Sequence, residues 1–185
     1  GAASDLATPT TAVDGTITLG SGATTATLNY TGTGHTSDRV VDLAGTTGGA
    51  ILNASGASGA LVLTSNLTAT GSGAKTLTLG GTGTGANTIQ GLIVDSGGGA
   101  TALTKTGAGN WVLTAANTYT GATAISGGGL HLSGSGAISS ANLNLSGGGV
   151  LGLSGTFSRT LGTGASQVRF TGTGGGFAAY GGALS

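Results

Sequence analysis

The sequence of 185 residues contains no cysteine or methionine, one proline and few aromatic side chains. The absence of cysteine excludes a disulfide framework and thiol chemistry. Charged residues make up only 5%, and the formal net charge is zero. A nucleic-acid partner requires a basic stripe, whereas the five cations lie far apart along the chain, at Arg39, Lys75, Lys105, Arg159 and Arg169. We therefore expect no nucleic-acid partner.

Long apolar runs are also missing. No run approaches the roughly 18 residues of a membrane-spanning helix, so no membrane insertion is expected. The periodicity of amphipathic helices is absent, and the residues that usually fill helix surfaces are scarce. Disorder is not predicted, because the hydrophobic fraction is 37% and the mean hydropathy is +0.31. The composition therefore predicts a folded, all-β protein.

Short segments with alternating apolar residues, bounded by Gly, Ser, Asn or Thr, occur along most of the chain. Successive side chains of a strand point to opposite faces, so the two-residue spacing of Leu, Val and Ile places them on one face. The pattern predicts strands at residues 16–19, 26–30, 39–43, 60–64, 75–79, 89–94, 111–114, 130–132, 143–145, 150–153 and 167–170.

Glycine clusters separate many of these segments, and the later clusters recur at intervals of roughly 20 to 30 residues, the period of solenoid rungs. A β-sandwich of this length needs more core aromatics than one Trp, three Tyr and three Phe. A parallel β-helix needs only stacked aliphatic residues with small residues at its corners. We predict a parallel β-helix (β-solenoid) over residues 15–185 with uncapped ends, and an arm or linker at residues 1–14.

One segment, residues 103–132, carries a specific motif. It resembles the autotransporter-associated β-strand repeat, or passenger-associated transport repeat, of bacterial surface and secreted proteins. The matching positions are Lys105, Gly107, Gly109, Trp111, Leu113, Asn117, Thr118, Tyr119, Gly121, Thr123, Ile125, Gly128 and Leu130. The resemblance implies a bacterial protein exported to the cell surface or the medium, and a right-handed parallel β-helix in which these positions are structural.

The residues of the motif agree with that fold. Trp111 and Leu113 alternate with Asn110, Val112 and Thr114, so that one face can bury the indole. Residues 117–121 have the composition of a turn whose asparagine can bond the backbone.

An enzyme is the least favoured of three functional classes. β-Helices include polysaccharide lyases and hydrolases, which need paired carboxylates. Asp38 and Asp42 fall on one face of a predicted strand but about 13 Å apart, too far for such a pair, so both are expected to be solvated surface residues. His35 and His131 lack neighbouring metal ligands. We expect no catalytic, cofactor-binding or metal site, no cofactor and no enzymatic activity.

An ice-binding or crystal-surface-binding solenoid is the alternative. Outward Thr-x-Thr pairs stacked on a solenoid can form a flat array, although threonine is also a common strand residue. The pairs occur at Thr16/Thr18, Thr25/Thr27, Thr31/Thr33, Thr68/Thr70, Thr76/Thr78, Thr82/Thr84, Thr118/Thr120 and Thr171/Thr173. Their spacing along the chain is irregular, which favours a structural role.

The favoured function is a structural extracellular module that forms a surface scaffold, an adhesin stalk or a homopolymeric filament. Residues 157–184 still resemble repeat sequence, and no capping helix is predicted at either end. We therefore expect the partner to be the protein itself, as a head-to-tail homopolymer or as adjacent repeats of a longer chain. A surface glycan or matrix component is a further expected partner.

Overall fold

The computed structural model describes residues 15–57, 59–134 and 137–184. Within these ranges all regular structure is β, and no helix is present that is long and apolar enough to cross a membrane. The strands are β1 (Ile17–Leu19), β2 (Ala26–Tyr30), β3 (His35–Ser37), β4 (Val41–Leu43), β5 (Ala50–Ala54), β6 (Leu61–Leu63), β7 (Lys75–Gly80), β8 (Asn87–Ile89), β9 (Thr101–Lys105), β10 (Asn110–Leu113), β11 (Thr123–Ile125), β12 (Gly129–Leu132), β13 (Leu143–Leu145), β14 (Gly149–Gly155), β15 (Thr160–Leu161), β16 (Gln167–Phe170) and β17 (Gly175–Leu184). The arm or linker predicted at residues 1–14 lies outside the described residues.

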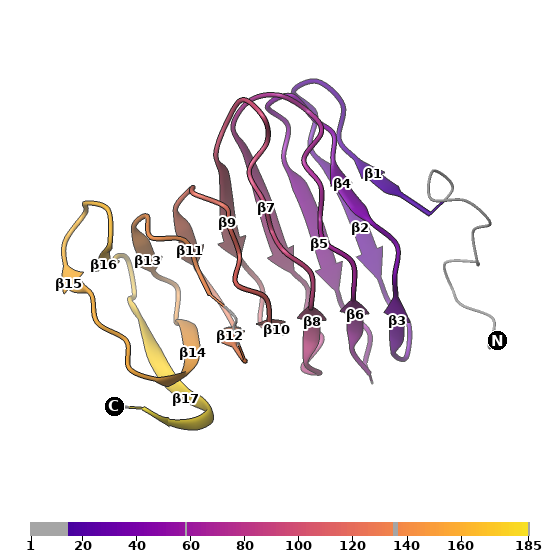
Figure 1. Cartoon of the computed structure of the whole chain (residues 1–185). Coiled ribbons are helices and arrows are strands. Elements are labelled where there is room, and N and C mark those ends of the chain that lie inside the picture. Colours follow the sequence, from indigo (N-terminus) through magenta and orange to yellow (C-terminus); the bar gives the residue numbers. More distant parts are fainter. Residues whose placement is uncertain (1–14, 58, 135–136, 185) are drawn as a thin grey trace.

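The chain coils into a parallel β-solenoid of about 7 turns, which confirms the predicted fold class (Figure 1). Successive turns contribute strands to two long sheets. Sheet 1 has the order β15-β16-β13-β11-β9-β7-β5-β2, and sheet 2 has the order β17-β14-β12-β10-β8-β6-β3. β1 and β4 pair on a third face at the N-terminal end.

The predicted strands agree with the structure where aliphatic residues alternate clearly. Those at residues 26–30, 143–145 and 167–170 match β2, β13 and β16 residue for residue. The strand predicted at 89–94 is wrong, because β8 ends at Ile89. Beyond it, the N–H groups of Leu92 and Ile93 bond to the side chains of Asn66 and Asn117. The pattern missed β3, β5, β9, β11, β15 and β17, most of which are rich in Ala, Gly or Thr.

Rows of aligned side chains form the core. Parallel pairing in register places equivalent residues of successive turns above one another, about 4.8 Å apart. One row of sheet 1 consists of Leu28, Leu52, Leu79, Lys105, Ile125, Leu145 and Phe170. A row of sheet 2 consists of Leu63, Ile89, Leu113 and Leu132. The aliphatic column expected from the two-residue spacing is therefore continuous, with a lysine in one of its rows.

The turns shorten partway along the rod. The second inward row of sheet 1 consists of Ala26, Ala50, Leu77, Leu103, Thr123, Leu143 and Val168. The chain between Leu77 and Leu103 is longer than the chain between Leu103 and Thr123, although each segment makes one turn. The turns that contain β7 and β9 accordingly reach higher in Figure 1 than those that contain β11 and β13.

We call this narrowing between β9 and β11 the step. The hydrogen bonds of Asn117 show the change in turn length. Its partner Ile93 in the preceding turn is 24 residues away, and its partner Ala137 in the following turn is only 20 residues away. A short turn cannot cover all of a longer one. The wider turn therefore needs additional side chains to close its core at the step.

We expect Leu77→Ala to lower the free energy of unfolding by about 2–5 kcal/mol, because it leaves a cavity inside a packed row. Leu77 is 0% exposed. The control is Leu28→Ala, which removes the same atoms from the partly exposed first turn and should have a smaller effect. Urea denaturation followed by circular dichroism measures both. Equal losses in the two variants would contradict this account of the core.

Candidate functional site

The motif of residues 103–132 lies at the step. It begins within β9, which completes the last of the wide turns, and ends with β12, which belongs to the narrow turns. Trp111, Leu113 and Leu130 are all 0% exposed. Lys105 and Thr123 interrupt the two inward rows of sheet 1 and are also buried, at 0% and 1% exposure. The motif therefore places both its largest apolar groups and two polar groups inside the solenoid.

Two aromatic side chains, Trp111 and Tyr119, fill the core at the step. Trp111 Nε1 donates a hydrogen bond of 2.9 Å to the carbonyl of Gly80 in the preceding turn. The hydroxyl of Tyr119 lies 2.8 Å from Thr123 Oγ1, so both polar atoms are satisfied, as burial requires. Burial raises the pKa of Tyr119 to about 12, so the phenol is neutral at physiological pH.

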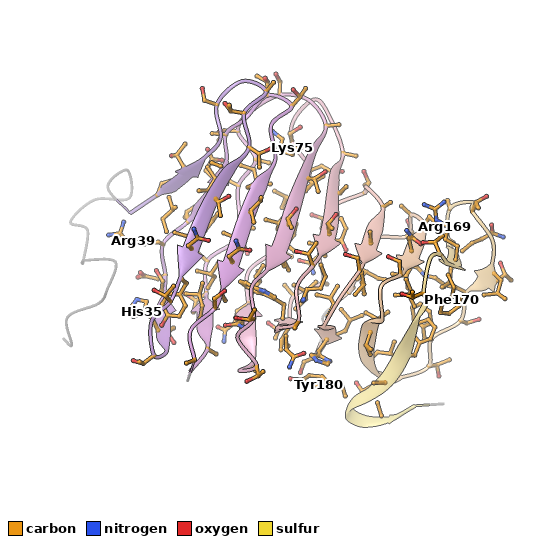
Figure 2. The ribbon with its side chains drawn as sticks, turned by 180° about the vertical axis from the view of Figure 1, so that it is seen from behind. His35, Arg39, Lys75, Arg169, Phe170 and Tyr180 are labelled. Atoms are coloured by element: carbon orange, nitrogen blue, oxygen red, sulfur yellow. The ribbon has the colours of Figure 1, made fainter. Side chains whose placement is uncertain are left out.

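Two lysines bind the backbone at corners of the solenoid. Lys105 Nζ donates 2.6, 3.0 and 3.0 Å hydrogen bonds to the carbonyls of Thr106, Gly107 and Gly127. Lys75 Nζ, in the wider turns (Figure 2), donates to the carbonyls of Leu43, Gly45 and Gly71. Burial lowers the pKa of Lys105 to about 8, whereas its three carbonyl partners favour the charged form. Each ammonium group thus satisfies carbonyls that turn inward at a corner.

Asn117 connects three consecutive turns. Its Oδ1 accepts a 2.8 Å hydrogen bond from the N–H of Ile93 in the preceding turn. Its Nδ2 donates a 2.9 Å bond to the carbonyl of Ala137 in the following turn. The asparagine therefore bonds the backbone of the adjacent turns on both sides. Thr118, the next motif position, is exposed.

Glycines of the motif lie where successive turns approach most closely. A Cβ at Gly121 would collide with the carbonyl oxygen of Thr101, and one at Gly128 with that of Gly109. Gly128 also has a φ of +59°, a conformation that L side chains rarely adopt. The motif glycines therefore allow backbone to stack directly on backbone.

The expectation that Asp42 is a solvated surface residue is wrong. Asp42 is 6% exposed, because the next turn stacks over it. Its carboxylate accepts hydrogen bonds from Thr68 Oγ1 at 2.7 Å, from the N–H of Thr70 at 3.1 Å, and from the Thr70 hydroxyl. Asp38 is exposed and lies outside any strand, since β4 begins only at Val41. The two carboxylates therefore do not share a strand face.

Asp95 makes the same kind of contact at the step, and the sequence reasoning missed it. Its carboxylate accepts hydrogen bonds from the N–H of Thr101 at 2.7 Å, and from the N–H and hydroxyl of Thr120 at 3.0 and 2.6 Å. Burial alone would raise the pKa of this carboxyl, but the hydrogen bonds hold it below its ordinary value. The signal that could have revealed both contacts is an Asp followed by Thr 25–28 residues later.

The Thr-x-Thr pairs do not gather on one face. Thr25/Thr27 and Thr76/Thr78 both face outward from sheet 1, but Gly49 and Ile51 occupy the aligned positions between them. Thr68/Thr70 and Thr120 are instead bound to the two aspartates described above. The structure thus separates the threonines that a flat ice-binding array would bring together.

The two histidines lie on different turns. His35 is in β3, and His131 is in β12, where its ring stacks on Tyr180 with 4.2 Å between centroids. Burial lowers the pKa of His131, and the nearby charge of Lys105 lowers it further. Within the described part of the chain, no group of three or more His, Cys, Asp or Glu residues is placed to hold a metal ion.

Comparison with known proteins gave one match. The family model of the passenger-associated-transport-repeat matches residues 103–132, which confirms the resemblance predicted from the motif. No curated protein and no solved structure matches the chain. The repeat therefore coincides with the segment that closes the wide turns and begins the narrow ones.

We expect Asp95→Ala to lower the free energy of unfolding by about 1–3 kcal/mol, because two N–H groups and a hydroxyl lose their charged acceptor. Asp38→Ala, at an exposed position, is the control and should have almost no effect. The lowered pKa of Asp95 means that its contribution is complete above pH 3.8 and is lost as the pH falls through the folded-state pKa. The difference between wild type and Asp95→Ala in urea denaturation should therefore shrink at acidic pH. A constant difference would contradict this role of the carboxylate.

The buried Lys105 should make the free energy of unfolding depend on pH in the alkaline range as well. Its pKa is lowered from 10.5 to about 8, so the folded state releases this proton more readily than the unfolded chain. Stability should therefore rise as the pH increases from about 8 to 10.5. Lys105→Met should lack this component, and subtracting its urea denaturation profile from that of the wild type isolates it. A difference that stays flat over this range would show that the ammonium is not desolvated.

Proposed function

We propose that the chain is a rod-forming structural segment of an exported bacterial protein, acting as a stalk or scaffold in the manner of an autotransporter passenger. The repeat match and the solenoid fold fit a passenger-type structural module. The repeat family also implies a protein of the bacterial surface or one that is secreted. The proposal adds the specific role: the segment supplies length and rigidity, and has no catalytic function.

The observation that carries this proposal is how the buried and half-buried polar groups are used. Lys75, Lys105, Asn117, Asp42 and Asp95 each bond to adjacent turns or to a corner of the solenoid. A catalytic group needs free polar atoms directed at a substrate. These side chains instead direct their polar atoms at the protein's own backbone and threonines. Their chemistry supports stacking of the turns.

The same observation separates the proposal from the glycan-active alternative. Asp42 and Asp95 accept their hydrogen bonds from different turns, and each carboxylate already binds two threonines. A glycosidase needs two carboxyl groups about 5–10 Å apart across an open cleft. The native chain should therefore release no reducing sugar or unsaturated uronate from a panel of bacterial and plant polysaccharides. Release that Asp42→Ala or Asp95→Ala abolishes would overturn the proposal.

A stalk should tolerate the loss of a whole turn, because each turn contacts only its neighbours. Deleting residues 77–102 joins Thr76 to Leu103, which is aligned with Leu77 in the sheet, and leaves the repeat of residues 103–132 intact. We expect this variant to unfold cooperatively and to form a rod about 4.8 Å shorter by small-angle scattering. The matched control deletes only residues 77–89, which breaks the register, and should lose the β signal in circular dichroism. Equal loss of structure in both deletions would contradict a modular rod.

A further inference from the structure

Four Asn-x-Ser/Thr triplets occur in the chain, at Asn29, Asn53, Asn66 and Asn144. This triplet is the acceptor sequence of N-linked glycosylation, in which a sugar is attached to the side-chain amide nitrogen. In a chain rich in serine and threonine such triplets also arise by chance, so their presence alone selects no site. A transferase must reach both the amide and the hydroxyl two residues later. The exposure and the hydrogen bonds of these two groups therefore decide which triplet can react.

In the triplet at Asn66, the hydroxyl is already engaged. Thr68 Oγ1 donates a 2.7 Å hydrogen bond to the carboxylate of Asp42 in the preceding turn. Leu67, the middle residue of the triplet, is buried in the core. A transferase would have to break the contact with Asp42 and draw a core residue outward. The fold therefore blocks this triplet.

The triplets at Asn53 and Asn144 are partly covered. Asn53 is half-buried, and its Nδ2 donates a 3.1 Å hydrogen bond to Asn29 Oδ1 in the preceding turn. Asn144 is also half-buried, and its Oδ1 accepts a 3.0 Å bond from Thr171 Oγ1 in the following turn. The hydroxyl residue of this triplet, Ser146, is half-buried as well. In both triplets a neighbouring turn therefore binds the amide.

Asn29 and Thr31 are both exposed, unlike the corresponding pairs of the other three triplets. Asn29 lies in β2 between Leu28 and Tyr30, whose side chains face the core, so its own side chain faces outward from sheet 1. Its Oδ1 accepts the bond from Asn53 Nδ2, and within the described ranges no acceptor binds its own Nδ2. The amide nitrogen is therefore accessible, while the oxygen is held in place.

A turn directly after β2 presents Thr31. The N–H of Gly34 donates a 2.8 Å hydrogen bond to the hydroxyl of Tyr30, the middle residue of the triplet. Tyr30 is buried, so the triplet is fixed at its centre and open at both ends. The neighbours of Thr31 are small, namely Thr33 and Gly34 in the turn, and Ser55, whose N–H bonds to the Tyr30 carbonyl at 2.8 Å. Small side chains leave the hydroxyl open to an approaching enzyme.

We propose that Asn29 is the acceptor of an N-linked sugar. The co-reactant is a sugar that carries a phosphate leaving group, linked to a nucleotide or to a lipid, and a transferase of the cell that produces the chain brings it to Asn29. The amide nitrogen forms a bond to the anomeric carbon, the bond between that carbon and the phosphate oxygen breaks, and the phosphate leaves with the electron pair. The amide proton passes to a base of the transferase. This modification does not depend on the proposed structural function.

The attached sugar supplies a property that the composition lacks. Charged residues make up only 5% and the net charge is zero, so electrostatic repulsion contributes little to keeping copies of the chain apart in solution. A glycan on an asparagine is bulky and solubilising. At Asn29 it projects from the outer face of sheet 1, where β2 and β5 lie side by side (Figure 1). The stacked core is not disturbed.

Trypsin separates Asn29 from the other triplets. Cleavage after Arg39 releases residues 1–39, which contain the Asn29 triplet and none of the other three. In the full chain purified from the cell that produces it, mass spectrometry should find a sugar on this peptide, and fragmentation should assign it to Asn29. A peptide of unmodified mass would overturn the proposal, and so would a sugar carried by a serine or threonine of the peptide.

Substitutions in the same cell test the two reacting positions. Asn29→Gln and Thr31→Ala should each abolish the modification, whereas Thr31→Ser should retain it, because the hydroxyl remains. Thr33→Ala is the matched control, since Thr33 is an exposed threonine of the same turn outside the triplet, and it should retain the sugar. Thermal melts establish that all four variants fold. A sugar that persists in Asn29→Gln or in Thr31→Ala would contradict the assignment of the acceptor.

Cell fractions distinguish the two donor classes. The full chain, produced in a host without N-linked glycosylation, is incubated with the soluble fraction of the source cells and a mixture of nucleotide sugars, or with their membrane fraction alone. Modification at Asn29 in the first mixture supports a nucleotide-linked donor, and modification in the second supports a lipid-linked donor. Modification in neither would overturn the proposal. All of these results leave the whole-turn deletion unaffected, because that experiment measures the folding of the chain itself.

Discussion

Stacking in register is the constraint on which the rest of this structure depends. When parallel turns follow one another at about 4.8 Å, each inward side chain lies directly on its equivalent in the next turn. The rows of sheet 1 satisfy this with Leu, Ile, Val and Ala, and the backbones of successive turns approach so closely that several positions accept only glycine. A residue is thus selected by what lies above and below it in the neighbouring turns, which are distant in sequence.

The same constraint explains why Lys105 and Thr123 interrupt the aliphatic rows of sheet 1 where the circumference changes. At the step, a wide turn is followed by a narrow one, so part of the wide turn has no equivalent above it. Tyr119 and Trp111 fill the core at the step. Thr123, in one inward row of sheet 1, is the hydrogen-bond partner of the Tyr119 hydroxyl. Lys105, in the other row, donates hydrogen bonds to backbone carbonyls at the corner. Asp95 in the wide turn then binds Thr120, near the end of the first narrow turn. The repeat motif is therefore the segment in which the last wide turn ends and the first narrow turns are formed.

A solenoid that uses its polar groups in this way keeps two kinds of surface for interactions: its outer faces and its ends. Charged residues make up only 5% of the sequence, so the outer faces offer few charged groups for contacts. The described C-terminal turn differs, because it combines an open strand edge, exposed aromatic rings and neighbouring cations. The proposed structural role depends on the length of the stacked turns, because each turn of a solenoid contacts only its neighbours.

The sequence alone determined the all-β class, the solenoid and the location of the repeat, because these follow from local signals: two-residue alternation, glycine at the corners, and a motif of fixed spacing. It did not reveal β17 or β9, since Gly, Ala and Thr give little alternation. It also misplaced Asp42 and overlooked Asp95, because their threonine partners in the next turn lie 25 to 28 residues away. Only the tertiary structure decided these contacts and the step, since turn length determines which residues are stacked and is not encoded in any single segment.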